Sequence, residues 1–373
     1  MSSHPRPYKV AIIGTGGIAR VHAEALSSLA DRVDLVAVAD VNLERATAFA
    51  ADFGVPAAYA DAAELLASES LDLVQICTPP GSHVPLTTMA MRAGVPALVE
   101  KPTALSLAEM ALLRAVQQET GVPVLTVFQH RFGAGALRLR KLLADGVLGR
   151  PLVAACETLW YRADEYFELP WRGRWDVEGG GPTMGHGIHQ FDLLLSILGP
   201  WSEITAFAAR QSRPTDTEDV SMALARFENG ALATVVNSVV SPKETSRLRF
   251  DFENATVEVN HLYGYRDVDW TFTPAEGKEA LSALWDLHDD SEVSGHRHQI
   301  AAILDAFDAG TRPAVDLDDA SRTLEFAAAT YASAFQGRPV RAGEIVEGDP
   351  FFASMDGRMV PWEPVKAAQG TQA

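Results

Sequence analysis

The feature that most constrains this chain is a glycine-rich turn joining a short apolar strand to a helix near the N-terminus. The sequence there reads Lys9-Val-Ala-Ile-Ile-Gly-Thr-Gly-Gly-Ile-Ala19. In this G-x-G-x-x-A pattern, Gly14 makes the tight turn, Gly16 lets the backbone approach a pyrophosphate, and Ala19 lets the helix pack on the strand. The helix start adds free N–H groups and a partial positive charge that favour an anion. An isolated match also fits a glycine turn without a ligand, so the surrounding sequence must decide.

The surrounding sequence favours a dinucleotide site. A second predicted strand, Leu35-Val-Ala-Val-Ala39, closes on Asp40. An acidic residue about 20 positions beyond the glycines can accept a hydrogen bond from a ribose 2′-hydroxyl. Asp40 would repel a 2′-phosphate; residues 41–43 bring no positive charge, and Arg45 lies a turn into the next helix. The sequence therefore predicts NAD as cofactor, with NADP disfavoured.

Strands and helices alternate up to residue 128, and six strands with five crossovers predict a doubly wound parallel Rossmann sheet. Beyond residue 129 the strands become longer and are punctuated by turns, as at Glu228-Asn-Gly230. This pattern, with predicted strands such as 220–227 and 267–272, predicts a C-terminal α+β domain with a large, mostly antiparallel open sheet. At 373 residues two domains are expected, and we place them at 1–128 and 129–373.

Composition narrows the classes of partner. The 31 basic and 49 acidic residues give a net charge of −18, which disfavours binding to nucleic acid or to an anionic membrane. No apolar run approaches the ~20 residues of a membrane span, and the first residues lack an apolar signal core. Two cysteines, Cys77 and Cys156, fall in separate predicted domains. We therefore expect a cytoplasmic protein with a small neutral substrate, no nucleic acid or membrane partner, and no bound metal.

Ligands of an open parallel sheet bind outside the carboxyl ends of its strands, so the residues there are candidates for cofactor contact. They are Gly14, Gly16, Gly17, Ile18, Ala19, Asp40, Thr78, Pro79, His83, Glu100 and Lys101. Lys101 directly follows an apolar strand, where a partly desolvated lysine can lose a proton readily or hold a substrate hydroxyl. A solvated lysine at the end of a strand is the other interpretation.

A second group of candidates lies in the run from Gly179 to Asp192. Three glycines allow a sharp turn, and the helix that follows carries Gly185, His189 and Asp192 on one face. His189 could take a proton near neutral pH, with Asp192 as its partner or as a substrate ligand. A histidine packed in an apolar helix is the alternative, and Lys101 nearby would favour catalysis.

Together these residues resemble the glucose-fructose oxidoreductase / inositol dehydrogenase / MocA (Gfo/Idh/MocA) family. The ordered set consists of the glycine turn 14–19, Thr78-Pro79 with His83, Glu100-Lys-Pro102, and the glycine run leading to His189 and Asp192. The likeness extends from Tyr8 to about Val340. It implies an NAD(P)-dependent oxidoreductase acting on a sugar, a cyclitol or a related polyol. It also implies that Lys101 is the motif lysine, that His189 is the catalytic histidine, and that the Lys101–Pro102 peptide is cis.

One position departs from this family, many members of which carry an aspartate four residues before the histidine. Gly185 stands there, followed by His186, which shares a face with His189 and could compensate. Candidate substrate residues are therefore His186, Asp192, Tyr161 and Arg174. The last two belong to an aromatic and basic segment that suits a sugar platform, although an aromatic edge of the core fits equally. His296-Arg-His298 could reach a pocket or be solvated.

The resemblance implies reversible hydride transfer between nicotinamide and a carbinol carbon. His189 would take the hydroxyl proton, and Lys101 would hydrogen-bond the same oxygen. Two alternatives remain open: an NAD-dependent glycosidase of the same fold and a non-catalytic NAD-sensing regulator. The long predicted strands 220–272 should present a broad sheet face, which predicts a homo-dimer or homo-tetramer joined through it.

Overall fold

The computed structural model describes residues 6–285 and 293–366, which pack as two units. The first unit contains residues up to 104, 109–129 and 295–321; the second contains 105–108, 130–294 and 322 onward. The expected boundary between residues 128 and 129 falls beside the one at Gln129. Residues 295–321, however, expected in the second domain, return to the first unit. The reason is packing: Ile300, Ile303 and Leu304 join the core of the first unit.

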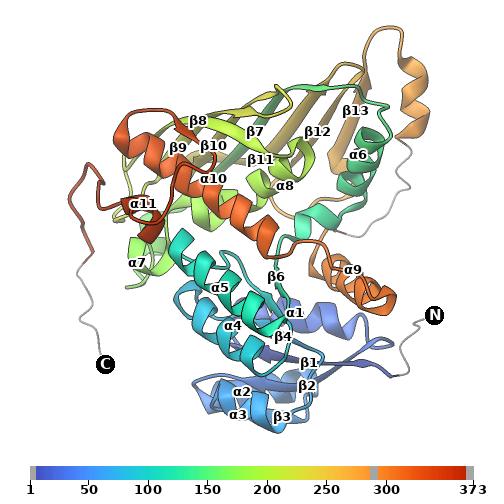
Figure 1. Cartoon of the computed structure of the whole chain (residues 1–373), viewed down its shortest axis with the longest axis vertical. Coiled ribbons are helices and arrows are strands. Elements are labelled where there is room, and N and C mark those ends of the chain that lie inside the picture. The colour runs from blue at the N-terminus through green and yellow to red at the C-terminus, as the bar shows by residue number, and fades with distance from the viewer. Residues whose placement is uncertain (1–5, 286–292, 367–373) are drawn as a thin grey trace. The chain divides into compact units, whose positions relative to one another are not determined.

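The first unit is built around a six-stranded parallel sheet in the order β3-β2-β1-β4-β5-β6 (Figure 1). This is the Rossmann strand order, so the predicted doubly wound sheet is confirmed. Its strands are β1 (Tyr8–Ile13), β2 (Val33–Ala39), β3 (Ala57–Tyr59), β4 (Leu73–Ile76), β5 (Ala97–Val99) and β6 (Val124–Thr126). Its helices are α1 (Gly17–Ser27), α2 (Leu43–Phe53), α3 (Ala62–Ser68), α4 (His83–Arg92), α5 (Leu107–Thr120) and α9 (His296–Ala309). β1 and β4 are buried, as expected of strands covered on both faces.

The second unit carries an eight-stranded sheet in the order β13-β12-β11-β7-β10-β9-β8-β14. All neighbouring pairs are antiparallel except β7 and β10, which confirms the mostly antiparallel sheet. The strands are β7 (Pro151–Tyr161), β8 (Trp201–Ala209), β9 (Val220–Phe227), β10 (Leu232–Ser238), β11 (Val240–Phe252), β12 (Ala255–His261), β13 (Trp270–Pro274) and β14 (Val340–Arg341). The helices are α6 (Ala134–Ala144), α7 (Trp175–Glu178), α8 (Ile188–Leu198) and α11 (Pro350–Ala353). The long helix α10 (Leu317–Gln336) begins in the first unit and continues in the second.

The strand predicted at 267–272 is partly wrong. Residues 267–269 form a 3₁₀ turn, and the strand begins only at Trp270. The Asp269 carboxylate accepts a hydrogen bond from the backbone N–H of Arg266, which closes this turn and delays the strand.

One face of the large sheet packs against α8 (Figure 1), and several apolar side chains on the opposite face are exposed. Side chains alternate along β9 and β10, so that Ala223, Ala225 and Val235 are buried. Apolar side chains that point the other way are 49–78% exposed: Val153, Phe207, Met222, Leu224 and Leu232.

Candidate functional site

The first unit contains a pocket at the carboxyl ends of β1, β2 and β4. Its wall includes Ile13, Gly14, Gly16, Ala39, Asp40, Val41, Arg45, Thr78, Pro79, Ser82 and Met89. Four of the predicted cofactor residues thus line one pocket beside Asp40. The predicted glycine turn lies at its base, where α1 begins at Gly17 with Gly16 as its N-cap.

The two motif glycines have different structural roles. Gly14 has φ +90°, and a Cβ on it would lie 2.7 Å from the Thr78 methyl and 2.9 Å from the Cys77 backbone. Only glycine fits there. A Cβ on Gly16 would meet nothing within 4 Å, although Gly16 lines the pocket. The backbone at Gly16 therefore borders open space at a helix N-terminus, which suits a pyrophosphate.

Ile18 lies on the exposed side of α1, and Ala19 lies on its buried side. Ile18 is 37% exposed at the start of α1, while Ala19 is fully buried against the sheet. Ala19 therefore has the packing role that its motif position predicts.

Asp40 follows β2 and is held by several donors at once. Its carboxylate accepts hydrogen bonds from the Thr15 backbone and hydroxyl, both 2.9 Å, and from the Asn42 backbone at 2.9 Å. Arg45 adds a bidentate pair at 2.6 and 3.0 Å. Burial opposes the charge, but these bonds outweigh it and lower the pKa of Asp40 to about 2. Asp40 is thus a carboxylate at neutral pH.

Residues 41–43 bring no positive charge to Asp40, but Arg45 does. Arg45 lies a turn into α2, yet its long side chain reaches back to Asp40 and lines the same pocket. The two residues are five positions apart, and the arginine side chain is long enough to span that separation. Because Arg45 lines the pocket and its side chain is 54% exposed, it offsets part of the repulsion that Asp40 would exert on a 2′-phosphate.

His83 forms hydrogen bonds to two backbone segments, one at Thr78 and one at Pro102. It is fully buried, with Nδ1 2.8 Å from the Pro102 carbonyl and Nε2 2.8 Å from the Thr78 carbonyl. Burial lowers the pKa of His83, which favours the neutral ring. His83 thereby holds the Thr78 turn against the segment after Lys101. The Lys101–Pro102 peptide is cis, as expected.

Glu100 and Lys101 follow β5 at the same edge of the sheet. The Glu100 carboxylate is buried and engaged by His22 at 2.9 Å and by His296 at 3.3 Å. Its side chain is therefore engaged within the protein, and Glu100 stays a prediction as a cofactor residue. His296 was expected either to reach a pocket or to be solvated. It is 7% exposed and paired with Glu100, so the solvated interpretation is wrong and contact with a pocket stays a prediction. His22 was missed because a histidine within an amphipathic helix carries no distinguishing motif.

His189 belongs to the second unit and lies near the start of α8. It is 3% exposed, and its ring centroid lies 5.1 Å from that of His130 and 5.9 Å from that of Tyr263. His186, one turn earlier, contacts Trp160 edge-on at 4.9 Å. The two predicted histidines thus share an aromatic surrounding, in which Tyr263 is 45% exposed. Such a surface can stack on the apolar face of a sugar ring.

The turn before α8 contains one π-helical turn, Thr183–Gly187, which includes Gly185. A Cβ on Gly185 would meet nothing within 4 Å, so a side chain fits there without a clash. The departure from the family pattern therefore leaves space at this position.

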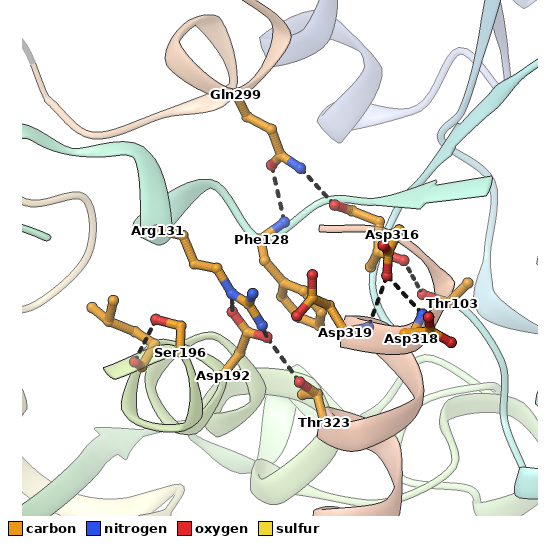
Figure 2. A network of polar contacts seen from close by, with 12 residues as sticks. Thr103, Phe128, Arg131, Asp192, Ser196, Gln299, Asp316, Asp318, Asp319 and Thr323 are labelled. Carbon is orange, nitrogen blue, oxygen red and sulfur yellow. Dashed lines mark hydrogen bonds and ion pairs between the residues drawn. The ribbon is translucent and has the colours of Figure 1, made fainter. Parts of the chain in front are cut away.

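Asp192 is bound within the protein (Figure 2). Arg131 donates to it at 2.6 and 2.7 Å, and the Thr323 hydroxyl donates at 2.8 Å. Asp192 is only 1% exposed. These contacts favour a role in holding α8 over the predicted contact with substrate.

Tyr161 and Arg174 have other neighbours than the two histidines. Tyr161 is 41% exposed at the end of β7, with the Arg213 guanidinium 4.8 Å from its ring. Arg174 is 7% exposed and pairs with Asp176 at 2.6 Å. Both therefore stay predictions as substrate residues.

Glu218 is a buried acid that sequence reasoning missed. It accepts hydrogen bonds from the backbone N–H groups of Gly181 at 2.9 Å and Thr183 at 3.1 Å, and from the Tyr331 hydroxyl at 2.8 Å. Burial raises the pKa of Glu218 to about 7, although these donors oppose the rise. Glu218 therefore holds the backbone at Gly181 and Thr183, which precedes His186 and His189 in the chain.

Known proteins match both parts of the chain. Residues 8–128 match the model of an oxidoreductase family with an NAD-binding Rossmann fold, and residues 136–258 match the GFO/IDH/MocA C-terminal domain. A D-apiose dehydrogenase from Paraburkholderia graminis is 31% identical over 371 residues, covering 93% of each chain. The chain belongs to the Gfo/Idh/MocA family of oxidoreductases. The predicted resemblance is thereby confirmed.

Two further proteins are similar to this chain. A myo-inositol 2-dehydrogenase from Thermotoga maritima is 28% identical and covers 62% of this chain and 68% of its own. The WlbA dehydrogenase from Bordetella pertussis, solved with NADH and UDP-GlcNAcA, is 25% identical with a TM-score of 0.79. That likeness covers 90% of this chain and 99% of the other. Among the described helices, none combines the length and apolarity needed to cross a membrane.

Proposed function

We propose that this member of the family is an NAD-dependent dehydrogenase that transfers a hydride between nicotinamide and a carbinol carbon of a sugar, cyclitol or related polyol. The observation that carries the proposal is the pocket beside Asp40. Its open backbone at Gly16 and its buried carboxylate suit a pyrophosphate and a ribose hydroxyl. The names of the relatives, which include apiose and inositol dehydrogenases, support the class of substrate.

The residues of the first unit would hold the cofactor. Gly14, Gly16 and Gly17 would hold the pyrophosphate, and Asp40 would accept a hydrogen bond from the ribose hydroxyl. The bound nicotinamide supplies hydride acceptance, which no side chain can provide. Lys101 would donate a hydrogen bond to the substrate oxygen and stabilise negative charge as it develops.

His189 would take the proton of the substrate hydroxyl. Its imidazole, a common general base, lies near the start of α8 with the rings of His130 and Tyr263 at 5.1 and 5.9 Å. Burial by these aromatic rings excludes water from the imidazole. His186 beside Trp160 is the nearest candidate for recognising a substrate hydroxyl in place of the family aspartate.

The test is to incubate the protein with NAD or NADP and a panel of aldoses, cyclitols and glycosides, and to record absorbance at 340 nm. NADH formation with at least one polyol supports the proposal. Cleavage of a glycoside without net NADH would favour the glycosidase, and NAD binding without turnover of any compound would favour the regulator.

We also propose a cytoplasmic homo-dimer or homo-tetramer assembled through the exposed face of the large sheet. The support is the row of exposed apolar side chains on β7, β8, β9 and β10, which a partner could cover. The free, buried cysteines 77 and 156 are compatible with a reducing compartment.

A further inference from the structure

Three titratable side chains converge inside the first unit. His22 comes from α1, Glu100 follows β5, and His296 opens α9. Their side chains are 0%, 8% and 7% exposed. Both histidines direct Nε2 at the same Glu100 oxygen, Oε1, at 2.9 and 3.3 Å. The rings of His22 and His296 lie 4.5 Å apart, so one carboxylate oxygen joins two helices.

The second carboxylate oxygen acts on the neighbouring lysine. Glu100 Oε2 accepts a hydrogen bond from the Lys101 backbone N–H at 3.1 Å. A carboxylate held by two histidines therefore fixes the peptide that precedes Lys101. The direction in which the Lys101 side chain leaves the sheet depends on that peptide.

His22 is itself held in place. Its Nδ1 lies 2.7 Å from Gln75 Oε1 on β4. With the Gln75 amide oxygen facing Nδ1, both neighbours of the ring accept hydrogen bonds, and a ring that donates to both carries two protons. Burial opposes the charge of such a ring, but Cys77 and Glu100 raise the pKa of His22 well above its usual value. Burial opposes the charge of Glu100 as well, but His22 and His296 lower the pKa of Glu100 well below its usual value.

We propose that His22, on the helix that begins at the glycine turn, is a positioning residue for Lys101 and acts by holding Glu100. The inference rests on the proposed function of Lys101 and deepens it. α1 starts where the cofactor pyrophosphate would lie, and His22 is on that helix. The geometry at Lys101 is thereby tied to the cofactor-binding helix through one carboxylate.

The same three side chains also have the composition of a metal site, since two imidazole nitrogens and one carboxylate oxygen lie within 4.8 Å of one another. We favour protons over a metal because the 2.9 Å spacing between His22 and Glu100 is that of a charge-assisted hydrogen bond. The two explanations differ in a property that can be measured directly, which is metal content.

The experiment compares three variants with the full-length wild type. His22→Leu removes the donor to Glu100, and His22→Gln restores a neutral donor near the Nε2 position. Tyr8→Phe is the matched control, because it removes a hydrogen bond of a 5% exposed side chain, to Asp308, in the same unit. Melting temperatures establish that each variant is folded.

The first measurement is steady-state kinetics with NAD and the substrate found in the panel. We expect His22→Leu to lower kcat by about tenfold or more, with each KM changed by less than about threefold, since misplacing a catalytic group costs rate. His22→Gln should recover kcat to within about threefold of wild type, and Tyr8→Phe should leave it within about twofold.

The second measurement needs no substrate. Acetic anhydride labels lysines, and mass spectrometry gives the labelling rate of Lys101 relative to surface lysines in each folded variant. We expect His22→Leu to change that relative rate by about threefold or more, His22→Gln to restore it, and Tyr8→Phe to leave it unchanged. Metal content is measured on the same samples.

The outcomes separate the proposed function from the positioning role of His22. Altered Lys101 labelling with rescue by His22→Gln, in a protein that oxidises no polyol, would defeat the proposed function and leave the positioning role standing. Normal turnover and normal labelling in His22→Leu would defeat the positioning role alone. About one equivalent of zinc in the wild type, lost in His22→Leu, would also overturn it in favour of a metal site. If His22→Leu fails to fold, the comparison rests on His22→Gln, whose labelling must then match wild type more closely than that of Glu100→Gln.

Discussion

Asp40 and Arg45 together should control the choice between NAD and NADP. The Asp40 side chain is 3% exposed and charged, whereas Arg45 is 54% exposed and neutralises part of that charge. We therefore expect the wild type to bind NAD more tightly than NADP by about tenfold, or about 1.4 kcal/mol. Asp40→Ser should abolish this preference, because it removes the repulsion and frees Arg45 for a 2′-phosphate.

The expected contribution of Arg45 to NADP binding follows from simple electrostatics. Two unit charges about 6 Å apart interact by about 3 kcal/mol at an effective dielectric constant of about 20. Because Arg45 is half exposed, solvent and salt reduce its share to about 1 kcal/mol, or about fivefold in Kd. Arg45→Ala should therefore weaken NADP binding about fivefold and change NAD binding by less than about twofold.

The assay is titration calorimetry of both cofactors with wild type, Asp40→Ser and Arg45→Ala. Asp52→Ser is the control, because it removes an acid from the same helix, α2, where Asp52 pairs with Arg20 on the surface. An unchanged ratio of the two Kd values in Asp40→Ser, or a ratio that moves equally in Asp52→Ser, would refute this explanation of selectivity.

Three further predictions concern the second unit. Asp192→Asn should lower the free energy of unfolding by about 3 kcal/mol or more in urea, because it removes the buried negative charge that pairs with the Arg131 guanidinium; a loss below about 1 kcal/mol would contradict this. Between about pH 4.5 and 7, Glu218 keeps its proton in the folded state but loses it in the unfolded state. The free energy of unfolding should therefore fall by about 3 kcal/mol as the pH rises through that range, and Glu218→Gln should flatten the dependence of this free energy on pH. Leu224→Lys on the exposed sheet face should shift the mass seen by light scattering toward the 40.2 kDa monomer, whereas Leu112→Lys on α5 should not.

The sequence was most informative where a motif imposes backbone geometry. The glycine turn, the strand alternation and the residue after β2 follow from period and spacing, and the structure places Gly14, Gly16 and Asp40 around one pocket. A positive φ at Gly14 is a local requirement, so local sequence reveals it.

Side-chain contacts between residues far apart in the sequence could not be predicted from local patterns. The contact between His22 and Glu100 spans 78 positions, and that between Glu100 and His296 spans 196. Only the return of α9 to the first unit brings His296 near Glu100, and that return depends on packing that no local pattern specifies. Asp192 was predicted as a substrate ligand because it shares a helix face with His189, but Arg131 approaches that face from another element.

The most direct test of the account is turnover by Lys101→Ala and His189→Ala, measured as NADH formation with NAD and the substrate identified in the panel. Each substitution should lower kcat by about 10²-fold or more, as expected for groups that hold the reacting oxygen or move its proton. Calorimetry should show little change in NAD affinity for His189→Ala, since His189 lies in the second unit. Near wild-type turnover by His189→Ala on the true substrate would contradict the proposed chemistry.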